Sequence, residues 1–188
     1  MSRFEEWVRA YARQAHADHT AFESCRDLPL DRIAECHRLL LLQMSCEKLC
    51  KAHLIQGGAS PETVRSSHAY IAGPLPGILR DQIDPTGRDR EKTGWLMTPI
   101  RHLSFEIEIL NPSLRRDGKR PDNCEYPWED QGIVYSPLDR TFATTQLVTS
   151  RAGTTFRKLL KLAINSILAQ SAAPPSRRGA TDGEEMIP

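Results

Sequence analysis

The sequence has no apolar run of 18 residues or more, so none of its segments has the length of a membrane-spanning helix. The first stretch, residues 1–14, is charged throughout and lacks the apolar core of a secretory signal peptide. These two absences predict a cytoplasmic protein that has no membrane partner.

Neither sign of charge dominates. The 25 Lys and Arg residues nearly balance the 24 Asp and Glu residues, which gives a net charge of +1. A dedicated nucleic-acid binder needs a surface of one sign, so we expect no DNA partner. Lysine is scarce, because 19 of the basic residues are arginine. Arginine suits bidentate contacts with carboxylate and phosphate, although GC-rich coding sequence produces the same excess.

Cysteine is scarce, with five residues in a chain of 188. Five is an odd number, and a chain of this size does not need a disulfide framework to be stable. Reduced thiols are the simplest interpretation. Cys46, Cys50 and His53 have the spacing of one helix face, but three ligands on one helix need a fourth from elsewhere to hold zinc. Small cysteines in a core are the commoner alternative. We therefore predict no metal site and no cofactor.

The hydrophobic pattern predicts an all-α fold, a bundle of four to five helices with one long irregular loop before the last helix. Ser2 and Glu5 form a capping-box pattern ahead of a helix of about five turns. A second helix extends over 32–56, with Asp31 as the expected N-cap and an apolar face wide enough for contacts on two sides. A short helix up to about residue 70 and another turn or two over 78–83 follow, and 84–94 is expected to be a loop.

The second half of the chain is less regular. We expect a helix over 99–110, although the β-branched residues of 105–110 also permit a strand. Residues 113–135 read as a long ordered loop, in which strand character is confined to 132–135. The last helix is predicted over 141–170, with Gly153 as a site of bending. The chain is thus expected to be a single domain, 1–170, followed by a disordered tail, 171–188.

Residues 41–52, LLQMSCEKLCKA, resemble the second-helix signature of HEPN domains: an apolar pair, Gln43, small residues, Glu47-Lys48 and then Lys51-Ala52. The segment that follows, with His68 ahead of an apolar stretch, is similar to the next part of such proteins. The resemblance implies a helical, usually dimeric domain. Some members are toxin or defence ribonucleases, and others serve only in binding or assembly.

Catalytic members of that family carry an Arg, a spacer of four to six residues and then a His, a pair suited to activating a ribose hydroxyl. Arg13 with His19 and Arg32 with His37 have this spacing, as about two pairs would by chance. At the start of the late helix, where the family places the motif, Arg101 and His102 are adjacent instead. Arg65 and His68 have a spacer of only two residues. Arg101, His102, Arg65 and His68 are nevertheless the candidate catalytic residues.

The loop at 114–128 has a basic first half and an acidic second half. Its arginines and aromatics would suit a nucleotide, RNA or a phosphorylated partner, with a phosphate on the guanidinium groups and a base on the rings. Alternatively, the two halves pair with each other while the aromatics anchor the loop on the bundle. The candidate ligand-binding residues are Arg115, Arg116, Arg120, Tyr126 and Trp128.

Taken together, these patterns favour an HEPN-like binding or assembly domain, expected to form a homodimer or to act with a protein encoded nearby. The alternative is a metal-independent endoribonuclease toxin or defence effector that uses an Arg/His pair.

Overall fold

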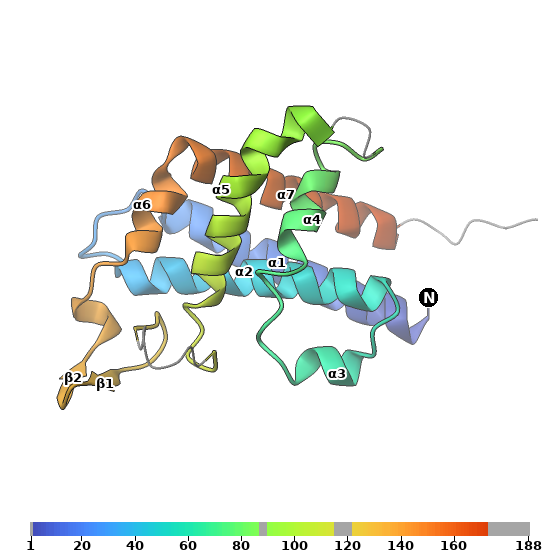
Figure 1. The fold of residues 1–188 in the computed structure, drawn as a ribbon. Coiled ribbons are helices and arrows are strands. Elements are labelled where there is room, and N and C mark those ends of the chain that lie inside the picture. Colours follow the sequence, from blue (N-terminus) through green and yellow to red (C-terminus); the bar gives the residue numbers. More distant parts are fainter. Residues whose placement is uncertain (1, 87–89, 115–121, 173–188) are drawn as a thin grey trace, which may run out of the picture.

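The computed structural model describes residues 2–86, 90–114 and 122–172. Within them the chain forms seven α-helices, one 3-10 helix and one two-stranded sheet (Figure 1). The all-α class is confirmed, while four to five helices proves slightly too few. Of the predicted disordered tail, 171–188, residues 171 and 172 instead belong to the last helix, and the remainder lies outside the described residues. The elements are α1 (Arg3–Cys25), α2 (Glu35–Gln56), α3 (Pro61–Arg65), α4 (Leu75–Asp81), α5 (Arg90–Glu108), β1 (Trp128–Asp130), β2 (Ile133–Tyr135), η1 (Pro137–Asp139), α6 (Ala143–Thr149) and α7 (Arg151–Ala172).

The first two long helices lie side by side and run in opposite directions (Figure 1). The predicted capping box starts α1: the Ser2 hydroxyl accepts from the Glu5 amide, and the Glu5 carboxylate accepts from the Ser2 amide. Fully buried Ala12 and Ala15 let α2 approach closely, and the Ser45 hydroxyl donates to the Ala15 carbonyl at 2.9 Å. The pair forms the base on which the other helices pack.

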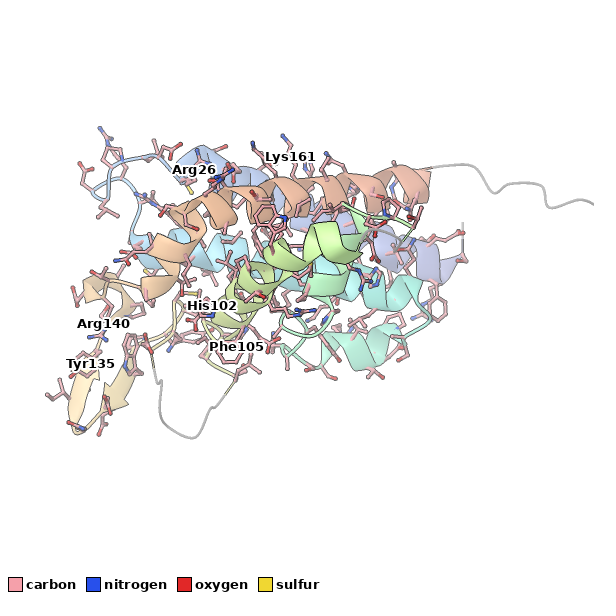
Figure 2. All side chains as sticks on the ribbon, turned by 45° about the horizontal axis from the view of Figure 1, so that its top comes forward. Arg26, His102, Phe105, Tyr135, Arg140 and Lys161 are labelled. Atoms are coloured by element: carbon pink, nitrogen blue, oxygen red, sulfur yellow. The ribbon has the colours of Figure 1, made fainter. Side chains whose placement is uncertain are left out.

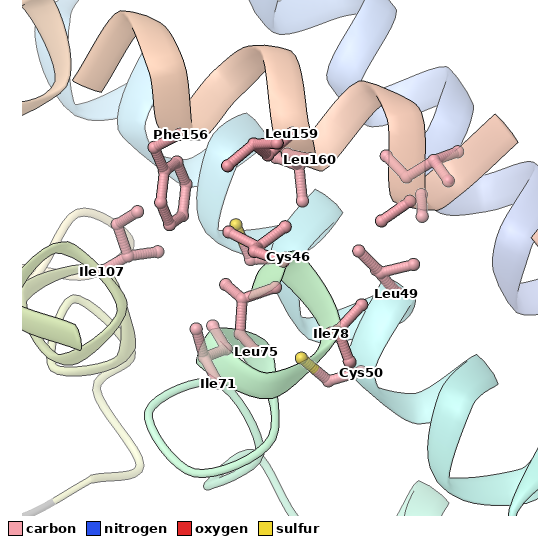
Figure 3. Close-up of a cluster of buried hydrophobic side chains, with 14 of the residues drawn as sticks. Cys46, Leu49, Cys50, Ile71, Leu75, Ile78, Ile107, Phe156, Leu159 and Leu160 are labelled. Atoms are coloured by element: carbon pink, nitrogen blue, oxygen red, sulfur yellow. The ribbon is translucent and has the colours of Figure 1, made fainter. Parts of the chain in front are cut away.

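Helix α2 is the central element, because it contacts all six other helices. This confirms the expectation of a helix contacted from two sides. Leu42, Cys46 and Leu49 of α2 are fully buried, and they belong to the main core together with residues of α4, α5 and α7. Burial of this apolar surface is the main source of stability. Figure 3 shows the layer formed by Cys46, Leu49, Cys50, Ile71, Leu75, Ile78, Ile107, Phe156, Leu159 and Leu160.

Several predicted helix bounds are wrong. Helix α2 begins at Glu35 with Ala34 at the N-cap, and Asp31 lies in the preceding turn. Helix α3 ends at Arg65, and α4 lies at 75–81 where the prediction had 78–83. Helix α5 begins at Arg90, inside the expected loop, and it carries Pro99 in its interior. The predicted helix over 141–170 is two helices, α6 and α7, separated at Ser150.

The predicted loop over 113–135 contains a β-hairpin, while residues 115–121 lie outside the described part. Strand β1 pairs antiparallel with β2, and Trp128 lies opposite Tyr135. Gln131 and Gly132 both have positive φ, 50° and 77°, as the tight two-residue turn of a hairpin requires. The hairpin projects from one end of the bundle (Figure 1).

A second, smaller core attaches the hairpin segment to the bundle. It joins Cys36 and Leu39 of α2 to Leu110, Cys124 and Phe142. The Cys124 amide donates to the Leu110 carbonyl at 3.3 Å. The alternative in which Tyr126 and Trp128 anchor the loop is therefore wrong in part, because Tyr126 is exposed and buried Cys124 and Phe142 provide the attachment.

His19 makes stability dependent on pH. It is buried in α1 against α7, and its Nε2 has no hydrogen-bond partner in the described residues. Burial lowers the pKa of His19; Glu23 and the backbone of Arg157 oppose this shift, whereas Lys161 and His16 add to it. As pH falls below about 6.5, the unfolded imidazole binds a proton before the folded one does. The free energy of unfolding should therefore decrease over that range.

The measurement is urea unfolding at pH 5 and pH 7.5. We expect a neutral glutamine at this position, His19→Gln, to remove part of the difference between the two pH values. Exposed His53 on α2, which is not among the groups that shift the pKa of His19, is changed to Gln as the control and should leave the difference unaltered. An identical pH dependence in wild type and His19→Gln would contradict the assignment.

Candidate functional site

The predicted Arg/His pairs do not come together. Arg101 and His102 are exposed on α5, and Arg65 is exposed at the end of α3. In the part of the chain that the structure describes, no hydrogen bond or ion pair links any of these three to His68. Figure 2 shows His102 near Phe105 on the outer surface of the bundle. The structure therefore leaves Arg101 and His102 as surface residues and singles out His68.

His68 is oriented by a carboxylate that sequence reasoning did not select. Its Nδ1 lies 3.1 Å from Oε1 of Glu47 in α2. An ionised carboxylate only accepts hydrogen bonds, so Nδ1 carries a proton, and in the neutral imidazole Nε2 then carries the lone pair. The side chain of His68 is 45% exposed while that of Glu47 is only 10% exposed. A buried carboxylate thus holds a half-exposed imidazole, which is the arrangement of a general base and its orienting group.

Glu47 is also the centre of a buried polar network. Lys51 donates from Nζ to Oε1 of Glu47 at 2.7 Å, and Gln43 donates from Nε2 to Oε2 at 3.0 Å. All three side chains come from one face of α2 at four-residue spacing, and all three residues are buried. Gln43, Glu47 and Lys51 therefore form an internal polar network, whereas Lys48, next to Glu47, pairs with Asp18 of α1 at 2.6 Å.

A second buried carboxylate fixes the segment that carries His68. Oε2 of Glu108, at the end of α5, accepts from the amides of Ile71 and Ala72, both at 2.7 Å. Fully buried Ile71 then enters the main core between α4 and α5. The segment between α3 and α4 is thus held at both ends by carboxylates, and the position of His68 is determined by the folded bundle.

The candidate ligand-binding residues fall into two groups. Arg115, Arg116 and Arg120 lie outside the described residues. Tyr126 is 57% exposed, and Glu125 raises its pKa through a side-chain hydrogen bond. Trp128 is half-buried, because its ring stacks on Tyr135 across the hairpin.

The Trp128 ring belongs to a small aromatic cluster. Its centroid is 5.9 Å from that of Tyr135, and the guanidinium carbon of Arg140 lies 6.0 Å from the Trp128 centroid and 5.5 Å from the Tyr135 centroid. Figure 2 shows Tyr135 and Arg140 close together at the base of the hairpin. The contacts are cation–π interactions that stabilise the hairpin. One face of the Trp128 ring is therefore used internally.

The thiols do not form a metal-binding face. Cys46 and Cys50 are fully buried and His53 is exposed, so the three do not meet. All five cysteines are free and buried. Burial raises the pKa of each, that of Cys124 to about 12, which makes them poor nucleophiles. Within the described ranges, no group of His, Cys, Asp or Glu has a geometry suitable for a metal ion.

Sequence reasoning missed Glu47, Lys51, Gln43 and Glu108 as members of the site. The four-residue spacing of Gln43, Glu47 and Lys51 was a usable signal, because it puts three polar side chains on one face of a largely apolar helix.

None of the helices in the described part of the chain is long and apolar enough to cross a membrane. Comparison with family models, with curated proteins and with solved structures found no match for this chain.

Proposed function

We propose that this chain is an HEPN-like helical binding or assembly domain that acts in the cytoplasm as a homodimer. The observation that carries the proposal is the projecting hairpin. Its Ile133 and Val134 are 56% and 72% exposed, and nearby Leu138 is 62% exposed. Single exposed apolar residues are ordinary, whereas several on one projecting element mark an interaction surface.

Other features support the same proposal. Gln43 and Lys51 of the signature contact Glu47 in the interior, and Lys48 pairs with Asp18 of α1, so these residues serve the fold. The side chains of Arg101 and His102 are exposed and make no hydrogen bond or ion pair within the described residues. The five buried thiols suit a reducing compartment. A domain with a completed core and an apolar projection is suited to assembly.

The test is self-association measured by sedimentation velocity over a wide concentration range. We expect wild type to dimerise and Ile133→Thr with Val134→Thr to shift the protein toward monomer, because threonine keeps the strand propensity while removing apolar contact area. Leu162→Gln, at a 53% exposed apolar position on α7, is the matched control and should dimerise as wild type does. A wild type that is monomeric at every concentration would contradict the proposal.

A second candidate is a metal-independent endoribonuclease, and the His68–Glu47 pair is the observation that favours it. In this case Nε2 of His68 would accept the proton of a ribose 2′-hydroxyl. We would then expect RNA cleavage in the presence of a chelator that falls about 10²- to 10⁴-fold in His68→Ala. His16→Ala, at an exposed position on α1, is the control. His102→Ala tests whether the pair formed by Arg101 and His102 takes part in cleavage. The assembly proposal expects no cleavage by any of these proteins.

A further inference from the structure

A cavity of about 260 Å³ lies where the end of α1, the loop that follows it, the start of α2 and helix α6 meet. Its apolar wall consists of Phe22, Leu39 and Val148, which are buried, and Leu30, which is 65% exposed. Sites for drug-sized ligands usually measure about 300–1,000 Å³, so a smaller ligand suits this one. The cavity shares no residue with the hairpin or with His68.

One polar wall is formed by Arg38. Its guanidinium donates to the carbonyls of Arg26, Leu28 and Ile33, at 2.9, 2.6 and 3.0 Å, and so holds the loop after α1. Within the described residues Arg38 has no carboxylate partner, and its buried Nε makes no hydrogen bond. Backbone carbonyls solvate the cation but do not neutralise it. The wall therefore keeps a positive charge.

The other polar wall is formed by Glu35, one helical turn from Arg38. Its Oε1 accepts from the amide of Phe142 at 3.0 Å and from the hydroxyl of Thr145 at 2.5 Å. Both donors are neutral, so the negative charge is retained, and Oε2 has no hydrogen bond in the described part of the chain. Glu35 and Arg38 do not pair with each other within 4.0 Å. The same cavity thus contains one charged group of each sign that forms no ion pair within 4.0 Å in the described residues, whereas Arg26, which also lines it, is paired with Glu23 and Asp27.

We infer that this cavity binds a small apolar α-amino acid as its zwitterion. The carboxylate of the ligand would lie on Arg38, its ammonium on Glu35, and its side chain against Phe22, Leu39 and Val148. Side chains three apart on a helix are about 5–6 Å apart at Cβ, which suits a ligand whose two charges are on adjacent atoms of one small unit. A ligand with one charge would leave the other wall unpaired. The inference does not depend on the proposed function.

The ligand series is the first test, by isothermal titration of the full chain. We expect L-leucine or L-phenylalanine to bind saturably. Leucinamide, which lacks the carboxylate, and 4-methylpentanoate, which lacks the ammonium, should each bind at least about tenfold more weakly, as expected for loss of a charge-assisted hydrogen bond. Glycine, which lacks the apolar side chain, should also bind more weakly. Equal binding of 4-methylpentanoate and L-leucine would overturn the inference, as would no binding of either amino acid at millimolar concentration.

Variants locate the site. Glu35→Gln keeps an acceptor for Phe142 and Thr145 while removing the charge, and we expect it to weaken L-leucine binding at least about tenfold. Val148→Phe fills the cavity and should abolish binding. Leu30→Ala should weaken binding, whereas Leu28→Ala, an exposed leucine of the same loop that does not line the cavity, should not. Binding that survives Glu35→Gln and Leu30→Ala unchanged would place the ligand elsewhere and overturn the inference even if Val148→Phe fails to fold.

Discussion

Replacing Gly153 by alanine is expected to destabilise the protein by about 3 kcal/mol, because a side chain at this position overlaps backbone. A Cβ there would lie 2.5 Å from the carbonyl carbon of Val148 and closer still to the carbonyl oxygens of Leu147 and Val148. These atoms are the last turn of α6, which cannot yield as a flexible side chain would. Helix α7 must therefore move away from α6, and the buried contacts of Val148 and Phe156 are disturbed.

The measurement is thermal and urea unfolding. For a domain of this size, about 3 kcal/mol corresponds to a decrease in Tm of about 6–12 °C. Gly77→Ala is the matched control, because Gly77 lies inside α4 and a Cβ there meets nothing within 4 Å. It should stabilise the protein by about 0.5–1 kcal/mol, since alanine loses less backbone entropy in a helix. Similar effects at the two glycines would show that the α6–α7 contact is looser than described.

The sequence predicts a single last helix because its apolar spacing does not change where α6 ends and α7 begins. Apolar residues continue with helical spacing through 141–170, since α6 and α7 pack on the same core. The break lies at Ser150, whose hydroxyl accepts from the Gly153 amide at 3.1 Å and caps α7. Periodicity reports which residues face the core, and it does not report a change of axis between two helices that share that core.

The bounds of α2 show a different limit. Asp31 has the chemistry of an N-cap, yet the helix begins four residues later. The turn before it is held by Arg38, which donates to the carbonyls of Leu28 and Ile33. A side chain inside α2 thus holds the loop before the helix, and capping rules consider only residues at the helix end. The capping box of α1 was predictable because both of its partners lie within four residues.

The candidate site was predictable only in part. His68 was selected for its resemblance to an Arg/His motif, but its actual partner, Glu47, is 21 residues away in sequence. Only the second strand of the hairpin could be predicted from the sequence. Residues 132–135 have strand character, whereas Trp128–Asp130 contains two acidic residues of low strand propensity. Its pairing depends on the turn at Gln131 and Gly132. Tertiary partners of this kind are not encoded in the local pattern.

Replacing Glu47 by glutamine is expected to destabilise the protein by about 3–5 kcal/mol. The change leaves the ammonium of Lys51, a residue only 5% exposed, without its charged partner. A buried charge that loses its counter-ion costs far more than the intact pair contributes. His68→Ala should cost less than about 1 kcal/mol, because the imidazole is half-exposed and its contact with Glu47 is solvent-screened.

The double variant Glu47→Gln with Lys51→Met separates charge from shape. Methionine fills much of the lysine volume, and the glutamine amide oxygen still accepts from Gln43 or His68, so no buried charge remains. Stability measured by urea unfolding should recover by about 2–3 kcal/mol relative to Glu47→Gln, within the range of coupling energies for residues in contact. Strict additivity of the two single changes would mean that the Glu47–Lys51 pair is not the source of the effect. Recovery of stability without recovery of any His68-dependent activity would assign to Glu47 a second role, that of positioning the imidazole.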